Sequence, residues 1–400
     1  MRSLEIFSGA GGLAEGLKLS GFHHAGLLEF NKDACNTLRV NFPKHNVFEQ
    51  DIRDFKYDQF SNIDVIAGGP PCQPFSLGGK AKGQKDKRDM FPYAINGIRN
   101  LTPKAFIFEN VKGLLRQSFA SYFNYVILQL TYPEIEKHEN EIWTDHLSRL
   151  EKTHTSGQYS GLKYNVVYRL INAANYGIPQ KRERVIIVGI RSDLDLEWSF
   201  PKETHSNESL LWDKFVSKEY WDRHKIATAE REVPNGSLKR RIEKLKTQFG
   251  FFSPDEKPWV TVRDALKDLP DPKCSDNSIV DHVFRDGAKS YPGHTGSYID
   301  EPSKTIKAGD HGVPGGENMI RYSDGSVRYF TIREAKRIQT FPDNYKITGS
   351  WTEGMRQLGN AVPVKLSTII GTGLNKKLSC QQNLKNKGQT VKASNLVLRS

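Results

Sequence analysis

Two side chains in this sequence combine reactive chemistry with a position at the end of an expected strand. Cys72 follows the apolar run 63–70, which predicts a buried strand that ends in a tight turn. A lone thiol at a strand end is a better candidate for a nucleophile than for a core side chain. Glu109 ends a second apolar run, where burial of its carboxyl group could let it donate or share a proton.

Two arginines could complete such a site. Gln180, Arg182 and Arg184 alternate by two before an apolar run at 185–190, so we expect them on one face of a strand. Two guanidinium groups there could hold an anion or a base carbonyl, and could lower the pKa of a nearby thiol from about 8.5. For the arginines, the alternative is an exposed edge strand with ion pairs. For Glu109, the alternative is a capping or ion-pairing role, which is more common for a glutamate at a strand end.

Short apolar runs alternate with helical patterns over the first half of the chain. Because the carboxyl ends of parallel strands meet at one edge of a sheet, polar residues that follow successive strands should gather there. These residues are Gly9, Glu29, Asp51, Cys72 and Glu109. We predict an α/β fold with a doubly wound, mostly parallel sheet, with strands near residues 4–7, 24–28, 46–48, 63–70, 105–108 and 185–190.

The first of these strands leads into a glycine-rich turn. Gly9-x-Gly11-x-x-Ala14 lies between a strand and a helix, and Glu29 follows after roughly 20 residues, where an acid would bind ribose hydroxyls. Packing needs also produce such turns, and the pattern does not separate a dinucleotide from another adenosine cofactor. Asp51 in isolation is more typical of a helix cap.

Composition limits the class of protein. The chain has 400 residues, more than the roughly 250 to 300 that one core usually covers, so we expect a large domain and a smaller one. Its net charge of +12 favours a polyanionic partner, nucleic acid first, although such an excess can simply aid solubility. Cys35, Cys72, Cys274 and Cys380 lie far apart, so neither a zinc site nor a disulfide framework is indicated.

No run approaches the length of a membrane span, and a cytoplasmic location without membrane contact is expected.

The sequence also suggests where the chain divides. Strand and helix patterns alternate over 1–195, with a charged helical insertion near 115–160 that we expect to be a solvated surface feature. Proline, glycine and charge dominate 196–327, helical spacing resumes in 328–375, and 376–400 is predicted to be a flexible basic tail.

Five motifs in a fixed order resemble the DNA cytosine-5 methyltransferase family. They are the segments 7–13 (FSGAGGL), 71–73 (PCQ), 109–111 (ENV), 180–184 (QKRER) and 359–363 (GNAVP). The resemblance implies an S-adenosylmethionine-dependent methyltransferase sheet with an irregular target-recognition domain at 196–327, and a segment at 328–375 that braces this domain and returns to the catalytic domain.

The resemblance also implies a reaction. In this family a cytosine is swung out of duplex DNA, the thiolate matching Cys72 attacks C6, and C5 takes a methyl group from S-adenosylmethionine. The carboxyl group matching Glu109 binds the N3 edge of the base, and Arg182 and Arg184 match residues that hold the base carbonyl and the nucleophile.

Further positions are implied by the same match. The cofactor contacts would be Phe7, Gly9, Ala10, Gly11, Gly12, Leu13, Glu29, Phe30, Asp51, Ile52, Pro71, Phe91, Asn360, Ala361 and Val362. The DNA contacts would be Gln73, Ser76, Gln180, Thr305 and Ile306. The cationic, glycine-rich segment 74–88 resembles the family's closing loop.

The implied partner is double-stranded DNA, bound by a monomer, with a restriction endonuclease as a companion that acts on the same sequence without stable contact. A tRNA cytosine-5 methyltransferase of the same fold is the first alternative, disfavoured by the long variable domain and the missing Cys-Phe-Thr tripeptide of that branch. A dinucleotide-dependent oxidoreductase would explain the glycine turn alone. A catalytically silent DNA-binding module would leave Cys72 without a role.

Overall fold

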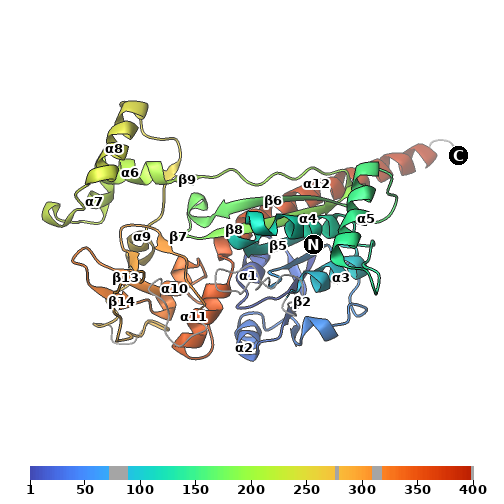
Figure 1. Ribbon diagram of the computed structural model, residues 1–400, viewed down its shortest axis with the longest axis horizontal. Coiled ribbons are helices and arrows are strands. Elements are labelled where there is room, and N and C mark those ends of the chain that lie inside the picture. Colours follow the sequence, from blue (N-terminus) through green and yellow to red (C-terminus); the bar gives the residue numbers. More distant parts are fainter. Residues whose placement is uncertain (72–88, 275–278, 309–317, 398–400) are drawn as a thin grey trace.

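The computed structural model describes residues 1–71, 89–274, 279–308 and 318–397, and side chains as far as residue 380. Its centre is a seven-stranded sheet with the strand order β3-β2-β1-β4-β5-β8-β6 (Figure 1). The first five strands are parallel to one another, whereas β8 runs antiparallel to both of its neighbours, β5 and β6. The strands are β1 (Arg2–Ile6), β2 (His23–Glu29), β3 (Val47–Glu49), β4 (Val65–Gly68), β5 (Ala105–Val111), β6 (Tyr164–Asn172) and β8 (Glu183–Arg191).

Helices cover both faces of this sheet because its strands alternate their apolar side chains between two cores. Ile66 and Phe106 point into a core with α3 (Phe91–Leu101) and α4 (Ala120–Thr131). Val65 and Ile107 point into the opposite core with α1 (Gly12–Leu19) and α12 (Val364–Val397). The predicted doubly wound α/β fold is therefore confirmed.

The segment 115–160 differs from its prediction as a solvated insertion. Its helix α4 buries Tyr122, Phe123, Val126 and Leu130 in the core of the sheet. Only α5 (Trp143–Ser156) has the expected exposed character, with His146 and Leu150 as its buried residues. The charged stretches that follow α4 in the sequence concealed a core helix.

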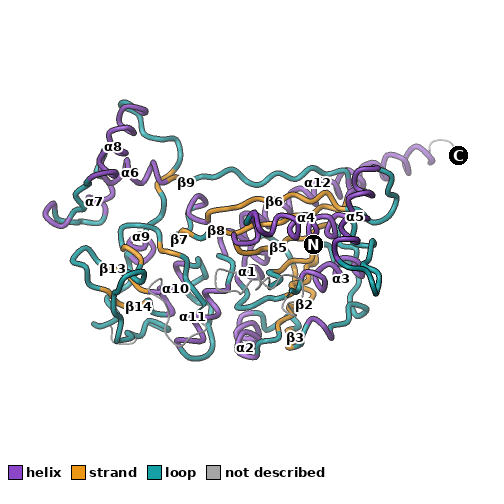
Figure 2. The backbone as a smooth tube through the Cα atoms, viewed as in Figure 1, coloured by secondary structure: helices purple, strands orange, loops and turns teal. Residues whose placement is uncertain are grey.

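The C-terminal helix returns to the start of the chain. Along α1 and α12, Gly16 and Gly371 face Ser367 and Ser20 so closely that a Cβ on either glycine would clash, which explains the small residues at this contact. The segment predicted as a tail continues α12 from residue 376 to Val397. Figure 2 shows this helix extending beyond the sheet towards the C-terminus.

The region after residue 196 contains two small bodies. One is the helical lobe, residues 207–252, with α6 (Asn207–Phe215), α7 (Glu219–Arg223) and α8 (Gly236–Phe249) around Leu210, Tyr220 and Trp221. The other contains short strands and helices, namely α9 (Val262–Leu266), β11 (Ser297–Tyr298), β13 (Met319–Arg321), β14 (Val327–Tyr329), α10 (Ile332–Ile338) and α11 (Trp351–Asn360).

One short strand pair joins the second body to the catalytic part, and another lies at the two ends of the helical lobe. β12 (Ser303–Lys304) pairs with β7 (Gln180–Lys181), and β10 (Lys257–Pro258) pairs with β9 (His205–Ser206). Within the described residues, no helix is both long and apolar enough to cross a membrane.

Candidate active site

The carboxyl ends of the parallel strands bring the predicted polar residues to one edge. Gly9 follows β1, Glu29 ends β2, Asp51 follows β3 and Glu109 lies near the end of β5. Cys72 lies outside the described residues, but the turn that leads to it is described. Parallel strand order therefore gathers four of the five predicted residues, as expected.

The turn before Cys72 is fixed by a side chain that the sequence analysis did not single out. Asn110 is buried, and its Nδ2 donates a hydrogen bond to the Pro70 carbonyl at 2.9 Å. The Pro71 carbonyl accepts a further bond from the Met90 backbone N–H at 3.2 Å. Asn110 lies inside the motif 109–111, so its position in that motif was the available signal.

Glu109 forms an ion pair across the sheet. The Nε of Arg184 lies 2.7 Å from Oε1 of Glu109, and both side chains are largely buried. The two residues come from the antiparallel strands β5 and β8, where Val111 is the direct partner of Arg184. A Cβ placed on Gly69 would lie 3.4 Å from Oε2 of Glu109, so this carboxylate is beside the turn that leads to Cys72.

Arg182 connects three segments of the chain. Its Nη2 donates to the Gly359 carbonyl at 2.9 Å and its Nη1 to the Ile306 carbonyl at 3.4 Å. Burial, together with the nearby charge of Arg184, lowers the pKa of this guanidinium, and Glu109 opposes the shift. Among the described residues its buried Nε has no hydrogen-bond partner.

Glu29 accepts three backbone hydrogen bonds beside the glycine turn. Its Oε2 accepts a hydrogen bond from Gly9 N–H at 2.8 Å, and its Oε1 accepts from Phe30 and Asn31 N–H at 3.0 and 2.9 Å. These bonds fix the carboxylate against the glycine turn. The neighbouring Phe30 ring is 70% exposed, although it is large and apolar, so it is free to stack on a ring.

The late motif packs against the glycine turn. Gly11 has φ +80° as the N-cap of α1, and a Cβ on Gly12 would clash with the Val362 carbonyl. The structure thus brings Asn360, Ala361 and Val362 to the turn that contains Gly9, Ala10, Gly11, Gly12 and Leu13. The Tyr345 hydroxyl also donates to the Ala10 carbonyl at 2.7 Å, a contact that no sequence motif indicated.

Other predicted cofactor residues have structural partners of their own. Asp51 caps a short 3₁₀ helix (Ile52–Asp54) and forms an ion pair with Arg53, which lowers the pKa of Asp51. Phe91 is fully buried in the sheet core, and Ile52 is buried beside it in the same cluster. Phe7, at the end of β1, is half-buried with φ +56°.

The predicted DNA contacts divide into two groups. Gln73 and Ser76 lie outside the described residues. Gln180 is fully buried, where its Nε2 donates to Oε1 of Gln339 and its Oε1 accepts from Ile306 N–H. Ile306 is buried as well, and the Thr305 hydroxyl donates to the Lys181 carbonyl at 2.9 Å. Gln180 therefore supports the segment after β12 that contains Thr305.

Gln339 lies in the segment 328–375 that was predicted to brace the second domain, but the sequence did not indicate its contacts. Its Nε2 donates to the Leu358 and Ala361 carbonyls, so it connects the Gln180 contact to the late motif. No spacing rule joins residues 180, 306 and 339, which meet only in the folded chain.

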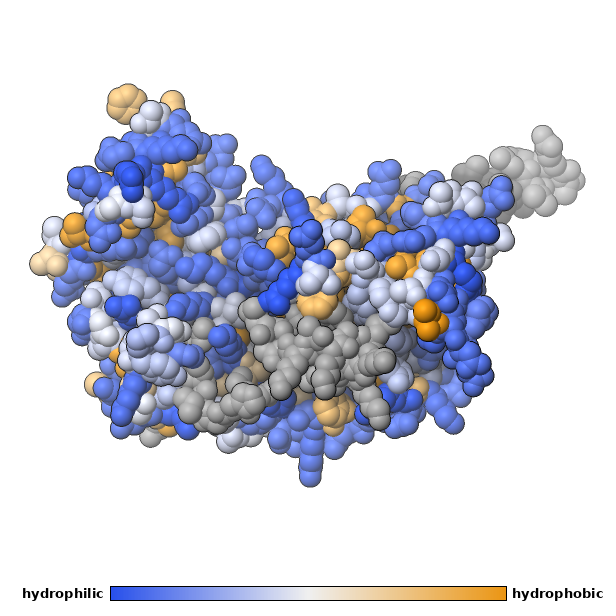
Figure 3. Space-filling model, in the orientation of Figure 1, coloured by the Kyte–Doolittle hydropathy of each residue, from blue (hydrophilic) through white to orange (hydrophobic). Residues whose placement is uncertain are grey.

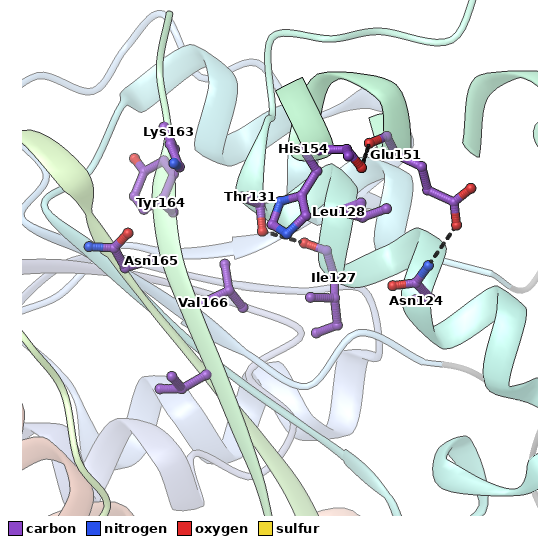
Figure 4. Close-up of a pocket in the computed structure, with 12 residues that line it drawn as sticks. Asn124, Ile127, Leu128, Thr131, Glu151, His154, Lys163, Tyr164, Asn165 and Val166 are labelled. Atoms are coloured by element: carbon purple, nitrogen blue, oxygen red, sulfur yellow. Dashed lines mark hydrogen bonds between the residues drawn. The ribbon is translucent and has the colours of Figure 1, made fainter. Parts of the chain in front are cut away.

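A groove of about 740 Å³ lies between α4, α5 and β6, away from this edge (Figure 4). Asn124, Glu151 and His154 line it, and Asn124 donates to Glu151. It shares no residue with the predicted site. No cluster of metal-ligand side chains occurs in the described part of the chain.

Comparisons with known proteins find relatives that match nearly the whole chain. The chain is 30% identical over 94% of its length to the Type II methyltransferase M.NgoMIV of Neisseria gonorrhoeae, and covers 97% of that protein. It is 32% identical over 92% of its length to M.Sau96I of Staphylococcus aureus, covering 74% of that protein. The S. pombe Dnmt2 methyltransferase structure has the same fold, with a TM-score of 0.53, 18% identity, and coverage of 94% of this chain and 98% of that one.

The family model "C-5 cytosine-specific DNA methylase" matches residues 1–132 and 144–376. The match includes α4, which agrees with the burial of that helix. The two matched ranges also contain every residue of the candidate site. The chain belongs to the C-5 cytosine-specific DNA methylase family.

Proposed function

We propose that this protein methylates C5 of a cytosine within a specific duplex DNA sequence, through a transient bond between Cys72 and C6 of the base. The observation that carries the proposal is the Glu109–Arg184 pair, fixed beside the turn that Asn110 holds before Cys72. A carboxyl group beside the turn that leads to the cysteine fits attack by its thiol on a ring whose N3 edge needs stabilisation.

Extrusion of the base is part of the proposal because C6 is inaccessible in a stacked duplex. The sulfur of Cys72 would bond to C6, and the electron pair of the C5–C6 double bond would move towards N3. The Glu109 carboxyl group would donate its proton to N3, and the Arg184 guanidinium would stabilise the carboxylate that remains. The unpartnered Nε of Arg182 is available for the base carbonyl. After methylation, loss of the C5 proton and of the thiolate restores the aromatic ring.

The residues at the glycine turn fit S-adenosylmethionine. The Glu29 carboxylate suits the ribose hydroxyls, the exposed Phe30 ring suits adenine, and the start of α1 has no side-chain cap to compete with a carboxylate. When bound there, S-adenosylmethionine supplies an electrophilic methyl group. The buried Phe91 and the paired Asp51 would contact it only through a rearrangement.

The chain's relatives are Type II methyltransferases, so we propose the modification half of a restriction-modification system, acting as a monomer on DNA. A companion restriction endonuclease would act on the same DNA sequence without forming a stable complex with this protein. No observation in the structure favours tRNA as the substrate.

The test is transfer of a labelled methyl group from S-adenosylmethionine to duplex DNA and, separately, to tRNA. We expect label in DNA as 5-methylcytosine and none in tRNA. DNA that contains 5-fluorocytosine at the methylated position should form an adduct that survives denaturation, because the fluorine blocks loss from C5. Label in tRNA alone, or no adduct with active protein, would contradict the proposal.

A further inference from the structure

The helical lobe presents a cationic helix face that the proposed reaction does not use. α8 has five basic side chains and one acidic side chain along its 14 residues. Leu238, Ile242, Leu245 and Phe249 recur at helical spacing, with Ile242 and Leu245 buried against the lobe. The opposite face of α8 therefore points to solvent.

The cations of α8 are not equivalent. Arg241 pairs with Glu208, and Lys246 pairs with Glu243. Arg240 and Lys244 lie one turn apart on the solvent face, and both are exposed. Neither has an ion-pair partner among the described residues. Two adjacent unpaired cations on one helix face match the spacing and charge of a phosphate backbone.

An aromatic pair follows the C-terminal end of this helix. The side chains of Phe251 and Phe252 are 104% and 80% exposed. Among the large apolar residues of the lobe, only Val233, at 82%, has a comparable exposure. Figure 3 shows the lobe as mostly hydrophilic, with a few apolar groups at its outer end. Exposed apolar rings beside unpaired cations are the composition of a nucleic-acid surface, where rings contact sugars and base edges.

The lobe contacts the segment that leads into β12. The Tyr220 hydroxyl donates to Oδ1 of Asp300 at 2.7 Å, and Arg263 forms an ion pair with the same carboxylate. Buried Lys214 donates to the Asp300 carbonyl and pairs with Glu232. Asp300 lies three residues before β12, so these contacts fix the lobe next to that strand.

We propose that the solvent face of α8 and the Phe251–Phe252 pair form a second DNA contact, outside the target base pairs. Arg240 and Lys244 bind phosphates of the flanking duplex, and the two rings pack against its groove wall. This inference rests on the proposed function, since it assumes that duplex DNA is the substrate. It adds flanking DNA as a determinant of affinity.

The experiment compares full-length protein with the double variant Arg240→Gln/Lys244→Gln. Its matched control is Lys44→Gln/Lys152→Gln, which removes two exposed cations, without ion pairs among the described residues, from the catalytic part. Binding is measured by fluorescence anisotropy over a range of salt, on a duplex that contains the mapped site with long flanks. Each lost phosphate contact should lower the salt slope by about 0.9, so we expect a reduction of about 1.8 and roughly tenfold weaker binding.

Two further arms identify the surface. Shortening the flanks should weaken binding of wild-type protein and of the control, but not of the α8 variant. Phe251→Ala/Phe252→Ala should weaken binding severalfold at an unchanged salt slope, whereas Ile142→Ala, which removes another exposed apolar side chain, should not. Methyl transfer at saturating DNA should be unchanged in all variants.

The outcomes separate the two proposals. If wild-type protein methylates DNA but the α8 variant matches the control in affinity, slope and flank dependence, the lobe contact is wrong and the function stands. If wild-type protein neither binds nor methylates duplex DNA, the proposed function fails, and this inference fails with it.

Discussion

Arg184 and Glu109 lie on neighbouring antiparallel strands, with the guanidinium Nε 2.7 Å from a carboxylate oxygen in a largely buried setting. The pair fixes the orientation of the carboxyl group beside the turn before Cys72. Because a charge in such a setting is expensive to leave unpaired, each residue depends on the other for its position.

Glu109→Gln should reduce kcat for methyl transfer by about 10²- to 10⁴-fold, because the amide cannot supply the proton or charge that the base edge needs. DNA binding should change little. The control is Glu183→Gln. Glu183 is an exposed glutamate at the start of β8, the strand that contains Arg184, and it pairs with Lys112. Steady-state kinetics measure both, and equal activity of the two variants would remove Glu109 from the mechanism.

Cys72→Ser should abolish methyl transfer because a hydroxyl is a far weaker nucleophile than a thiolate. S-adenosylmethionine binding, measured by calorimetry, should be retained. Cys274→Ser is the control, since Cys274 is an exposed free cysteine far along the chain. Substantial turnover by Cys72→Ser would rule out the covalent step.

Glu29→Gln should weaken S-adenosylmethionine binding about 10- to 100-fold, as expected from the loss of charge-assisted hydrogen bonds. The amide would also oppose the N–H groups of Gly9, Phe30 and Asn31 with a donor. Glu49→Gln is the control, since Glu49 ends β3 and forms an ion pair with Arg39. A cofactor affinity equal to that of the control would place the ribose elsewhere.

The sequence alone predicted those parts of the fold that depend on local residue patterns. Apolar runs predicted β1 to β5 and β8, and strand-end polar residues predicted the edge where Glu29 and Glu109 lie. β6 was missed because it is an edge strand whose exposed residues interrupt the apolar pattern. Gln180 could not be placed in the interior, since its partners Ile306 and Gln339 are more than 120 residues away in sequence.

Gln180→Ala tests this interior role against the predicted DNA contact. It leaves the Ile306 N–H and the Gln339 side chain without their partner in a buried place, so we expect a loss of about 2 to 4 kcal/mol in the free energy of unfolding. Urea denaturation measures this, with exposed Gln158→Ala as the control. If stability is unchanged while sequence preference relaxes, Gln180 is a base contact instead.

His24 should make the stability of the fold depend on pH. Its Nδ1 contacts the Ser3 hydroxyl and its Nε2 the Ala14 carbonyl of α1. Burial lowers the pKa of His24 from 6.5 to about 4, against the effect of the Ala14 carbonyl and with smaller contributions from His45, Lys18 and His23. Between pH 6.5 and about pH 4, the imidazole is therefore mostly neutral in the folded state and mostly protonated in the unfolded chain.

Stability falls on acidification because the unfolded chain takes up a proton on His24 that the folded chain does not. The contribution of His24 is present above pH 6.5 and is lost as pH falls from 6.5 towards 4, by about 2 kcal/mol between pH 7 and pH 5. His24→Gln should be less stable at pH 7 but lose less on acidification, whereas exposed His23→Gln should follow wild type. Urea denaturation at the two pH values measures the difference, and parallel losses in wild type and His24→Gln would show that other buried groups cause the acid sensitivity.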